Sequence, residues 1–212
     1  MSNAQTIAKS GITLAAIAAI CTSLVATTYH LTEDRIAAND KALLEQSLHP
    51  ALSDLFYDSG VSESRLVLPP PHDLPGNDEA EIYRVYANQE PVAALFVVTA
   101  RDGFAGPIRI LLGVEMSGVV TGIRILKHRE TPGLGDKIVE SRSDWVHQFA
   151  GHSIGDPIVT EWAIRRDGGD FDQITGASVT PRAVIKAMRD TLIYFNENRD
   201  EIFAAPATEE AS

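Results

Sequence analysis

The sequence predicts an α+β protein with one N-terminal transmembrane helix, followed by a domain with a largely antiparallel sheet and packed helices. Three observations carry this prediction: an uncharged apolar run near the N-terminus, several β-rich segments separated by short turns, and a long amphipathic segment near the C-terminus. Strands that follow one another, with helices grouped after them, are typical of α+β domains. The 212 residues suffice for one compact domain with an appendage.

The apolar run lies between Ser10 and Thr32, which enclose no Asp, Glu, Lys or Arg. Roughly 20 apolar residues are enough to cross the hydrocarbon core of a membrane. We therefore predict a transmembrane helix over residues 10–32, with residues 1–9 in the cytoplasm because Lys9 precedes the run. A cleaved signal peptide is the alternative, although its apolar region is usually shorter. The many small side chains in the run favour packing against other membrane helices.

Residues 33–80 are predicted to connect this helix to the domain. Leucine and isoleucine recur at helical spacing, so Glu33–Phe56 is predicted to form an amphipathic stalk helix. The segment 58–64 and the proline-rich "LPPPHDLPGNDE" that follows from Leu68 are predicted to break regular structure.

The domain is predicted over residues 81–204, with residues 205–212 as a disordered tail. Trp145 and Trp162 are expected to anchor its core. β-Branched and aromatic residues predict strands, and helical spacing predicts helices. The expected strands are Glu81–Ala87, Pro91–Ala100, Ile108–Met116, Val119–His128 and Asp156–Ile164; the expected helices run from about Asp136 to Phe149 and from about Pro181 to Phe203.

Composition excludes several classes of function. A net charge of −11, with no cluster of Lys and Arg, argues against a nucleic-acid-binding surface. Cys21 is the single cysteine, which excludes an intramolecular disulfide, an iron–sulfur cluster and a cysteine-rich zinc site within the chain. The six histidines lack ligand spacing, so no metal site is predicted.

The stretch "DQITGASVTPRAV" places three hydroxyl side chains before a predicted helix. Pro181 suits the first helical position, which makes Thr180 the expected N-cap. Ser178 lies just before the helix, where free N–H groups and the helix dipole can hold a phosphate. Gly176 and Ala177 leave room for a bulky group near the backbone. The pattern is not a nucleophile elbow, a P-loop or a dinucleotide fingerprint.

The "DQITGAS" segment resembles the D-x-x-[ST]-G-A-[TS] flavinylation motif of FMN-binding domains. In that family a flavin transferase joins FMN through a phosphoester to the last hydroxyl, most often that of a threonine. The resemblance implies one covalent FMN per chain on Ser178, with Thr180 as the alternative acceptor. Thr175, Gly176 and Ala177 complete the motif. Asp172 opens it, and would serve the transferase, through its magnesium, more than the finished protein.

Three further segments sharpen the resemblance: "DGFAGPIRILLGVEMSGVVTGIRILKHRETPGLGDKI", "SRSDWVHQFAG" and "RRDGGDFDQITGASVTPRAV". Together with the apolar run they are similar to the G subunit of Rnf electron-transport complexes, called Rsx in some bacteria. This implies an electron carrier of the bacterial inner membrane with its FMN domain on the periplasmic side. Its partners would be the other membrane subunits, the transferase and lipid, in a complex that couples ferredoxin and NAD electron transfer to ion translocation. The chain would then be a non-catalytic electron-transfer subunit of a translocase.

"ETPGLGD" has two interpretations. Pro132, Gly133 and Gly135 could simply make a tight connector from strand to helix. By the resemblance, Glu130, Thr131, Gly133, Leu134 and Gly135 would line the isoalloxazine ring, with Leu134 over one face and Thr131 bonded to the polar edge. Phe104 is a further candidate ring contact, and Arg165 and Arg166 would meet either the FMN phosphate or solvent.

Two alternatives remain open from the sequence. The C subunit of the sodium-pumping NADH:quinone oxidoreductase shares the FMN-binding domain. A non-redox, membrane-anchored binding module would use Ser178 and Thr180 only as helix caps.

Overall fold

The computed structural model describes residues 3–52, 64–76 and 79–204, and the chain divides into two units, 1–43 and 44–212. The first unit is helical throughout its described residues. It belongs to α1 (Asn3–Ala51), whose last turns lie in the second unit. Within α1, the 19 residues Gly11–Tyr29 are long and apolar enough to span a membrane. The predicted stalk helix is confirmed as far as Ala51; its last residues and the predicted disordered tail lie outside the described ranges.

The second unit is built on a five-stranded antiparallel sheet with strand order β1-β2-β3-β4-β5. Four strands confirm the predictions to within about a residue, whereas β1 was not predicted because it is short and directly precedes the prolines. The strands are β1 (Arg65–Leu68), β2 (Ala80–Ala87), β3 (Glu90–Ala100), β4 (Ile108–Glu115) and β5 (Val120–Lys127).

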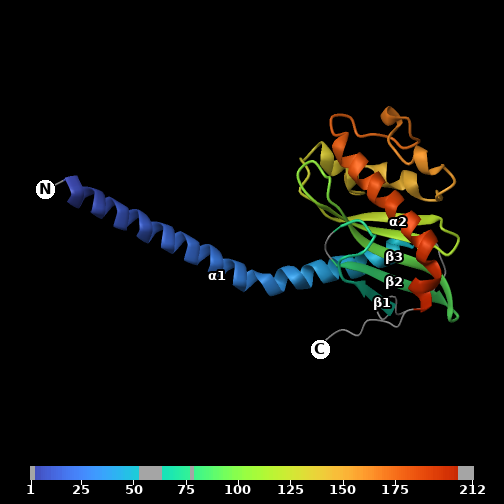
Figure 1. The fold of residues 1–212 in the computed structure, drawn as a ribbon, viewed down its shortest axis with the longest axis horizontal. Coiled ribbons are helices and arrows are strands. Elements are labelled where there is room, and N and C mark those ends of the chain that lie inside the picture. Colours follow the sequence, from blue (N-terminus) through green and yellow to red (C-terminus); the bar gives the residue numbers. More distant parts are fainter. Residues whose placement is uncertain (1–2, 53–63, 77–78, 205–212) are drawn as a thin grey trace. The chain divides into compact units, whose positions relative to one another are not determined.

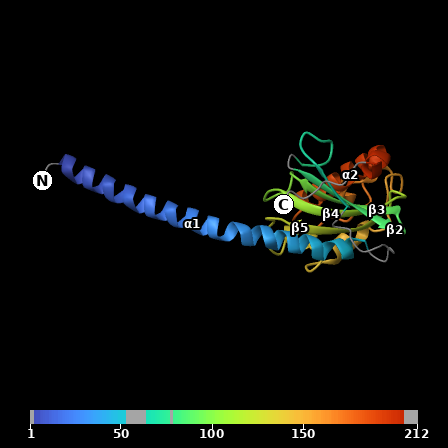
Figure 2. The same cartoon turned by 90° about the horizontal axis from the view of Figure 1, so that it is seen from below.

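Both faces of the sheet are covered. In β3 every residue from Ala93 to Val98 is buried, and successive side chains point to opposite faces. Ala94, Phe96 and Val98 join the larger core, while their neighbours join a smaller one that contains Ala51 and Leu52 from the end of α1. Figure 2 shows α2 on one side of the sheet and the end of α1 on the other.

Helix α2 (Val179–Ala204) packs against β3 and β4 and closes the larger core (Figure 1). Its predicted apolar face is confirmed: Val184, Met188, Leu192 and Phe195 are all buried. The ring of Phe195 meets that of Phe96 edge-on, with 5.8 Å between centroids.

Between β5 and α2 the chain forms short 3₁₀ helices. The predicted helix over 136–149 is wrong. Two 3₁₀ helices, η2 (Gly135–Ile138) and η3 (Asp144–Phe149), replace it, because Ser143 is extended and its side chain caps η3 by accepting from the Trp145 N–H. Trp145 is buried, as predicted.

The predicted strand over 156–164 is also wrong. The segment instead contains η4 (Val159–Glu161) and is followed by η5 (Arg165–Asp167). Pro157 has no N–H to donate to a sheet. The indole N–H of Trp162 donates to the carbonyls of Ser153 and Pro157, so the chain curls around this buried ring.

Candidate functional site

Three segments meet around a pocket of about 160 Å³. They are the loop after β3, the loop after β5, and the turn that leads into α2. Most of the predicted site residues line this pocket, although the segments that carry them, 130–135 and 176–180, lie far apart in the sequence. Its lining is Phe104, Glu130, Thr131, Leu134, Gly135, Gly176, Ala177, Ser178, Val179 and Thr180.

The loop after β5 is closed by its own backbone. The carbonyl oxygen of Thr131 accepts from the N–H groups of Leu134 and Asp136, at 3.2 and 3.3 Å. Gly133 has φ +77°, a left-handed conformation that favours glycine. Gly133 is not among the lining residues, whereas Leu134 is 42% exposed and lines the pocket. The connector interpretation of this loop is therefore compatible with its place in a pocket wall.

The hydroxyl cluster is arranged differently from the prediction. Helix α2 begins at Val179, so the predicted N-cap role of Thr180 is wrong and Ser178 occupies the position before the helix. The Ser178 carbonyl accepts from the Arg182 N–H at 3.4 Å, the first bond of the helical pattern. Thr180 turns inward, because its hydroxyl donates to the buried Glu130 carboxylate at 2.5 Å.

Ser178 and Thr180 therefore differ in what their hydroxyl groups can do. Thr180 is fully buried and already bonded. Ser178 is only half-buried, and no residue in the described ranges gives its hydroxyl a hydrogen bond. Ser178 alone of the two offers an accessible oxygen at the helix start.

The turn before the helix brings two walls of the pocket together. The Ala177 N–H donates to the Ile174 carbonyl at 3.0 Å, and Gly176 has φ +85°. A Cβ at Gly176 would lie 3.1 Å from a methyl carbon of Leu134, so this position also requires a close approach. Thr175 is exposed and does not line the pocket.

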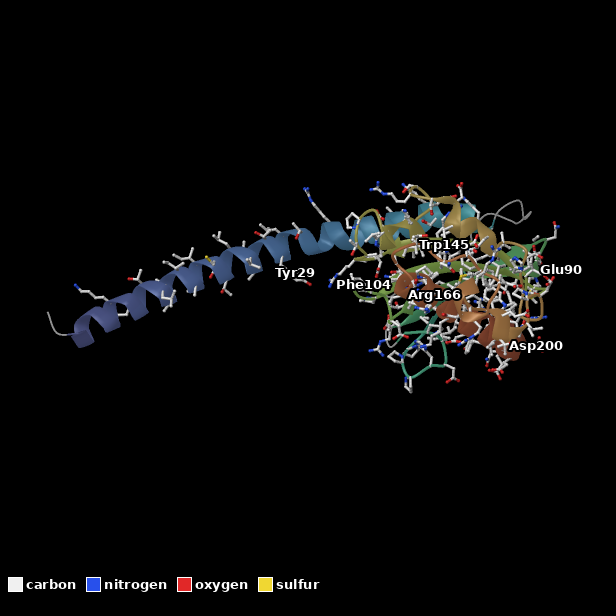
Figure 3. The ribbon with its side chains drawn as sticks, turned by 90° about the horizontal axis from the view of Figure 1, so that it is seen from above. Tyr29, Glu90, Phe104, Trp145, Arg166 and Asp200 are labelled. Carbon is white, nitrogen blue, oxygen red and sulfur yellow. The ribbon has the colours of Figure 1, made fainter. Side chains whose placement is uncertain are left out.

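Asp172 lies outside the pocket lining, on the surface. Its carboxylate is 61% exposed and pairs with the Arg165 guanidinium at 2.9 Å. Its backbone is fixed from both sides, since its N–H donates to Gln148 at 2.7 Å and its carbonyl accepts from the Trp145 indole at 2.6 Å. Arg166 is exposed (Figure 3).

A second ion pair, between Asp167 and Arg182, joins the loop before Ser178 to the first turn of α2. Arg182, one turn into α2, donates two hydrogen bonds to Asp167, the longer at 2.8 Å. The hydrogen bond from Arg182 lowers the pKa of the Asp167 carboxyl below its ordinary value. Sequence reasoning missed Arg182 and Val179; the signal for Arg182 is its position four residues after Ser178, on the same side of the helix.

The residues present fit an FMN group. A phosphate on Ser178 would lie at the N-terminus of the 26-residue α2, where N–H groups lack intrahelical partners and the dipole is positive. Phe104, Leu134 and Val179 supply an apolar rim for a flat ring; Phe104 is 69% exposed.

Comparison with known proteins gives consistent matches. Residues 103–193 match the FMN-binding domain family, and residues 1–50 match the RnfG N-terminal region. The chain is 40% identical over 200 residues to the G subunit of the ion-translocating oxidoreductase complex of Vibrio parahaemolyticus, covering 94% of each chain. It is 39% identical over 204 residues to the G subunit from Shewanella baltica, covering 96% of each chain. It is also 39% identical over 207 residues to the G subunit from Cronobacter sakazakii, covering 96% of this chain and 97% of that protein.

Proposed function

The chain belongs to the family of G subunits of ion-translocating oxidoreductase complexes, and from this premise we propose that it is a membrane-anchored electron carrier with one FMN joined covalently to Ser178. FMN supplies the capacity to accept and pass on electrons. The protein binds the flavin, orients it and sets its electronic environment.

The observation that carries the proposal is the contrast between two neighbouring hydroxyl groups. The Ser178 oxygen is accessible at the pocket edge and at the positive end of α2. The Thr180 hydroxyl is buried and committed to Glu130. This supports Ser178 as the acceptor and Thr180 as part of the framework.

Attachment would be a phosphoryl transfer catalysed by a flavin transferase. Ser178 would supply the oxygen that bonds to the phosphorus of FMN, with FMN donated from a flavin dinucleotide in which a phosphoanhydride joins it to a second nucleotide. The phosphoanhydride bond would break as the new O–P bond forms, the second nucleotide would leave, and the hydroxyl proton would pass to a base of the transferase. Asp172 is exposed beside the attachment loop and so is available to the transferase.

The pocket suits a carrier more than an enclosed enzyme. About 160 Å³ is below the ~300–1,000 Å³ typical of sites that enclose a small molecule. Leu134, Phe104 and Val179 would contact the ring, and Thr131 would hydrogen-bond its polar edge, while part of the ring stays open to a redox partner. Apart from Ser178, whose oxygen forms the bond to FMN, we assign no described residue to bond-making chemistry.

The apolar segment of α1 supports a location of this protein in the bacterial inner membrane. The segment Gly11–Tyr29 would cross the bacterial inner membrane in contact with lipid and the other subunits, with Lys9 on the cytoplasmic side. The FMN domain would then face the periplasm, where covalent attachment prevents loss of the flavin. In this complex the chain would relay electrons within a system that couples ferredoxin and NAD to ion movement.

The relatives also bear on the two alternatives. The matched proteins are named as G subunits of ion-translocating complexes and cover nearly the whole chain, which favours the Rnf-type complex over the related sodium-pumping enzyme. A non-redox binding module would need no accessible hydroxyl at Ser178.

The experiment is to express the full chain with a flavin transferase and purify it in detergent. A denatured gel band should fluoresce under ultraviolet light, and the tryptic peptide 167–182 should gain the mass of FMN less one water. Ser178→Ala should abolish both signals. The control Thr180→Val removes only the other hydroxyl and should keep both. A colourless wild-type chain, or loss of flavin from Thr180→Val alone, would contradict the proposal.

A further inference from the structure

Glu130 is a buried carboxylate that joins all three walls of the pocket. One oxygen accepts from the Thr180 hydroxyl at 2.5 Å, at the start of α2. The other accepts from the backbone N–H of Ala105 at 3.1 Å, in the loop after β3. Glu130 itself begins the third wall, and a Cβ on the neighbouring Gly135 would lie only 2.6 Å from its carboxylate. The side chain therefore acts as an internal clamp.

Glu130 is 4% exposed, and no ion pair within the described residues involves it. Each of its two oxygens has one hydrogen-bond partner, Thr180 Oγ1 at 2.5 Å and the Ala105 N–H at 3.1 Å. A negative charge on a carboxylate buried in this way would be screened less than one on the surface, so its field would reach the pocket that Glu130 lines.

We propose that Glu130 is a positioning residue that clamps the three pocket walls and holds a fixed negative charge beside the flavin, which keeps the reduction potential of the flavin low. The inference rests on the proposed function, because it needs an FMN in this pocket. A negative charge nearby disfavours any further negative charge on its neighbour. A flavin becomes more electron-rich on reduction, so Glu130 stabilises the oxidised state relative to the reduced one.

The test is a spectroelectrochemical titration of the full, flavin-loaded chain in detergent, with mediator dyes as electron donors. Glu130→Gln keeps the shape: the amide oxygen can accept from the Ala105 N–H while the amide nitrogen donates to the Thr180 hydroxyl, which can turn to accept. The midpoint potential of this variant should be more positive than that of the wild type.

Glu90→Gln is the matched control. Glu90 is exposed at the start of β3, whereas the loop bearing Phe104 follows the other end of β3, and Figure 3 shows the two residues far apart. The same loss of charge there should leave the potential unchanged. An unchanged or more negative potential in Glu130→Gln, or an equal shift in Glu90→Gln, would overturn the inference.

A second variant covers the case in which Glu130→Gln fails to fold or to take up flavin. Thr180→Val keeps the carboxylate but removes the hydroxyl that holds it, so the charge can turn toward water and be screened. Its potential should rise, and a potential equal to that of the wild type would reject the inference. A wild-type chain without flavin would instead contradict the proposed function itself.

Discussion

The two faces of the sheet are closed in different ways. One face carries the larger core, built with α2 and the 3₁₀ segments, and the pocket is formed by the segments that cover this face. The other face buries a small cluster: Ala51, Leu52, Tyr83, Val85, Ala93, Leu95, Val97 and Leu111. Two of these eight residues belong to the end of α1 and the turn after it.

On this second face, the backbone at the end of α1 lies close to the sheet. The Ala51 carbonyl accepts from the Thr121 hydroxyl at 2.5 Å. Gly113 and Gly122 leave room for that carbonyl on the sheet. We conclude that the α2 face supplies most of the hydrophobic stability and holds the site, whereas the other face attaches the end of the anchor helix.

The largest expected effect is on the α2 face. Phe195→Ala removes a fully buried ring that contacts Phe96, and should lower the free energy of unfolding by about 3–5 kcal/mol. Denaturant unfolding of the full chain in detergent measures this loss. The control Phe203→Ala removes a partly buried ring near the end of the same helix and should cost clearly less. Equal losses would contradict the assignment of the main core to this region.

A smaller effect is expected on the opposite face. A Cβ at Gly113 would meet the Thr121 hydroxyl oxygen and would lie 2.5 Å from the Ala51 carbonyl oxygen to which this hydroxyl bonds. Gly113→Ala should therefore displace both groups, move the end of α1 off the sheet and cost about 1–3 kcal/mol. Flavin fluorescence on a denatured gel should persist, because the pocket is built by the segments on the other face. At Gly122 the corresponding distance is 3.2 Å, and Gly122→Ala should be milder. If Gly113→Ala removed the flavin while the chain stayed folded, the two faces would not be independent.

Thr121 and Thr191 are two buried threonines on opposite faces of the sheet, and each donates one side-chain hydrogen bond whose contribution to stability can be compared. Thr121→Val removes the donor that joins β5 to the Ala51 carbonyl, and should cost about 1 kcal/mol in unfolding free energy. Thr191 is equally buried, but its hydroxyl donates at 2.8 Å to the Ala187 carbonyl within α2. That carbonyl already takes part in the helical pattern, so Thr191→Val should cost less. The reverse order would show that the contact with Ala51 adds nothing to stability.

Prediction from sequence succeeded where the pattern is local. Runs such as Ala93–Val98 predict a strand from β-branched and apolar residues alone. The glycines of "ETPGLGD" and "DQITGAS" likewise predict tight loops. The strand over 156–164 failed because the Trp162 indole, bonded to two carbonyls, decides the path of that chain. The helix start was misplaced because Thr180 bonds to Glu130, which is 50 residues away in sequence. Rules based on local sequence spacing cannot predict a hydrogen-bond partner that is 50 residues away.

The smallest expected effect concerns the surface pair that holds the loop before Ser178 to α2. Asp167 accepts two hydrogen bonds from Arg182, and this bonding lowers the pKa of Asp167 below its ordinary value of 3.8. A carboxyl with a lowered pKa in the folded state adds stability above its ordinary pKa, and that stability is lost as the pH falls through the lower, folded value. Asp167→Asn should therefore lower the midpoint of thermal unfolding slightly at pH 7, and the difference from the wild type should shrink in acid and in high salt.

Asp170→Asn is the control, because it makes the same charge change in the same loop. The bond between Asp170 and Arg165 uses the backbone carbonyl of Asp170 and not its carboxylate, so this variant should lack the acid dependence. A difference between Asp167→Asn and wild type that persisted unchanged below the folded pKa would mean that the loop is held by packing over the α2 face and not by this pair.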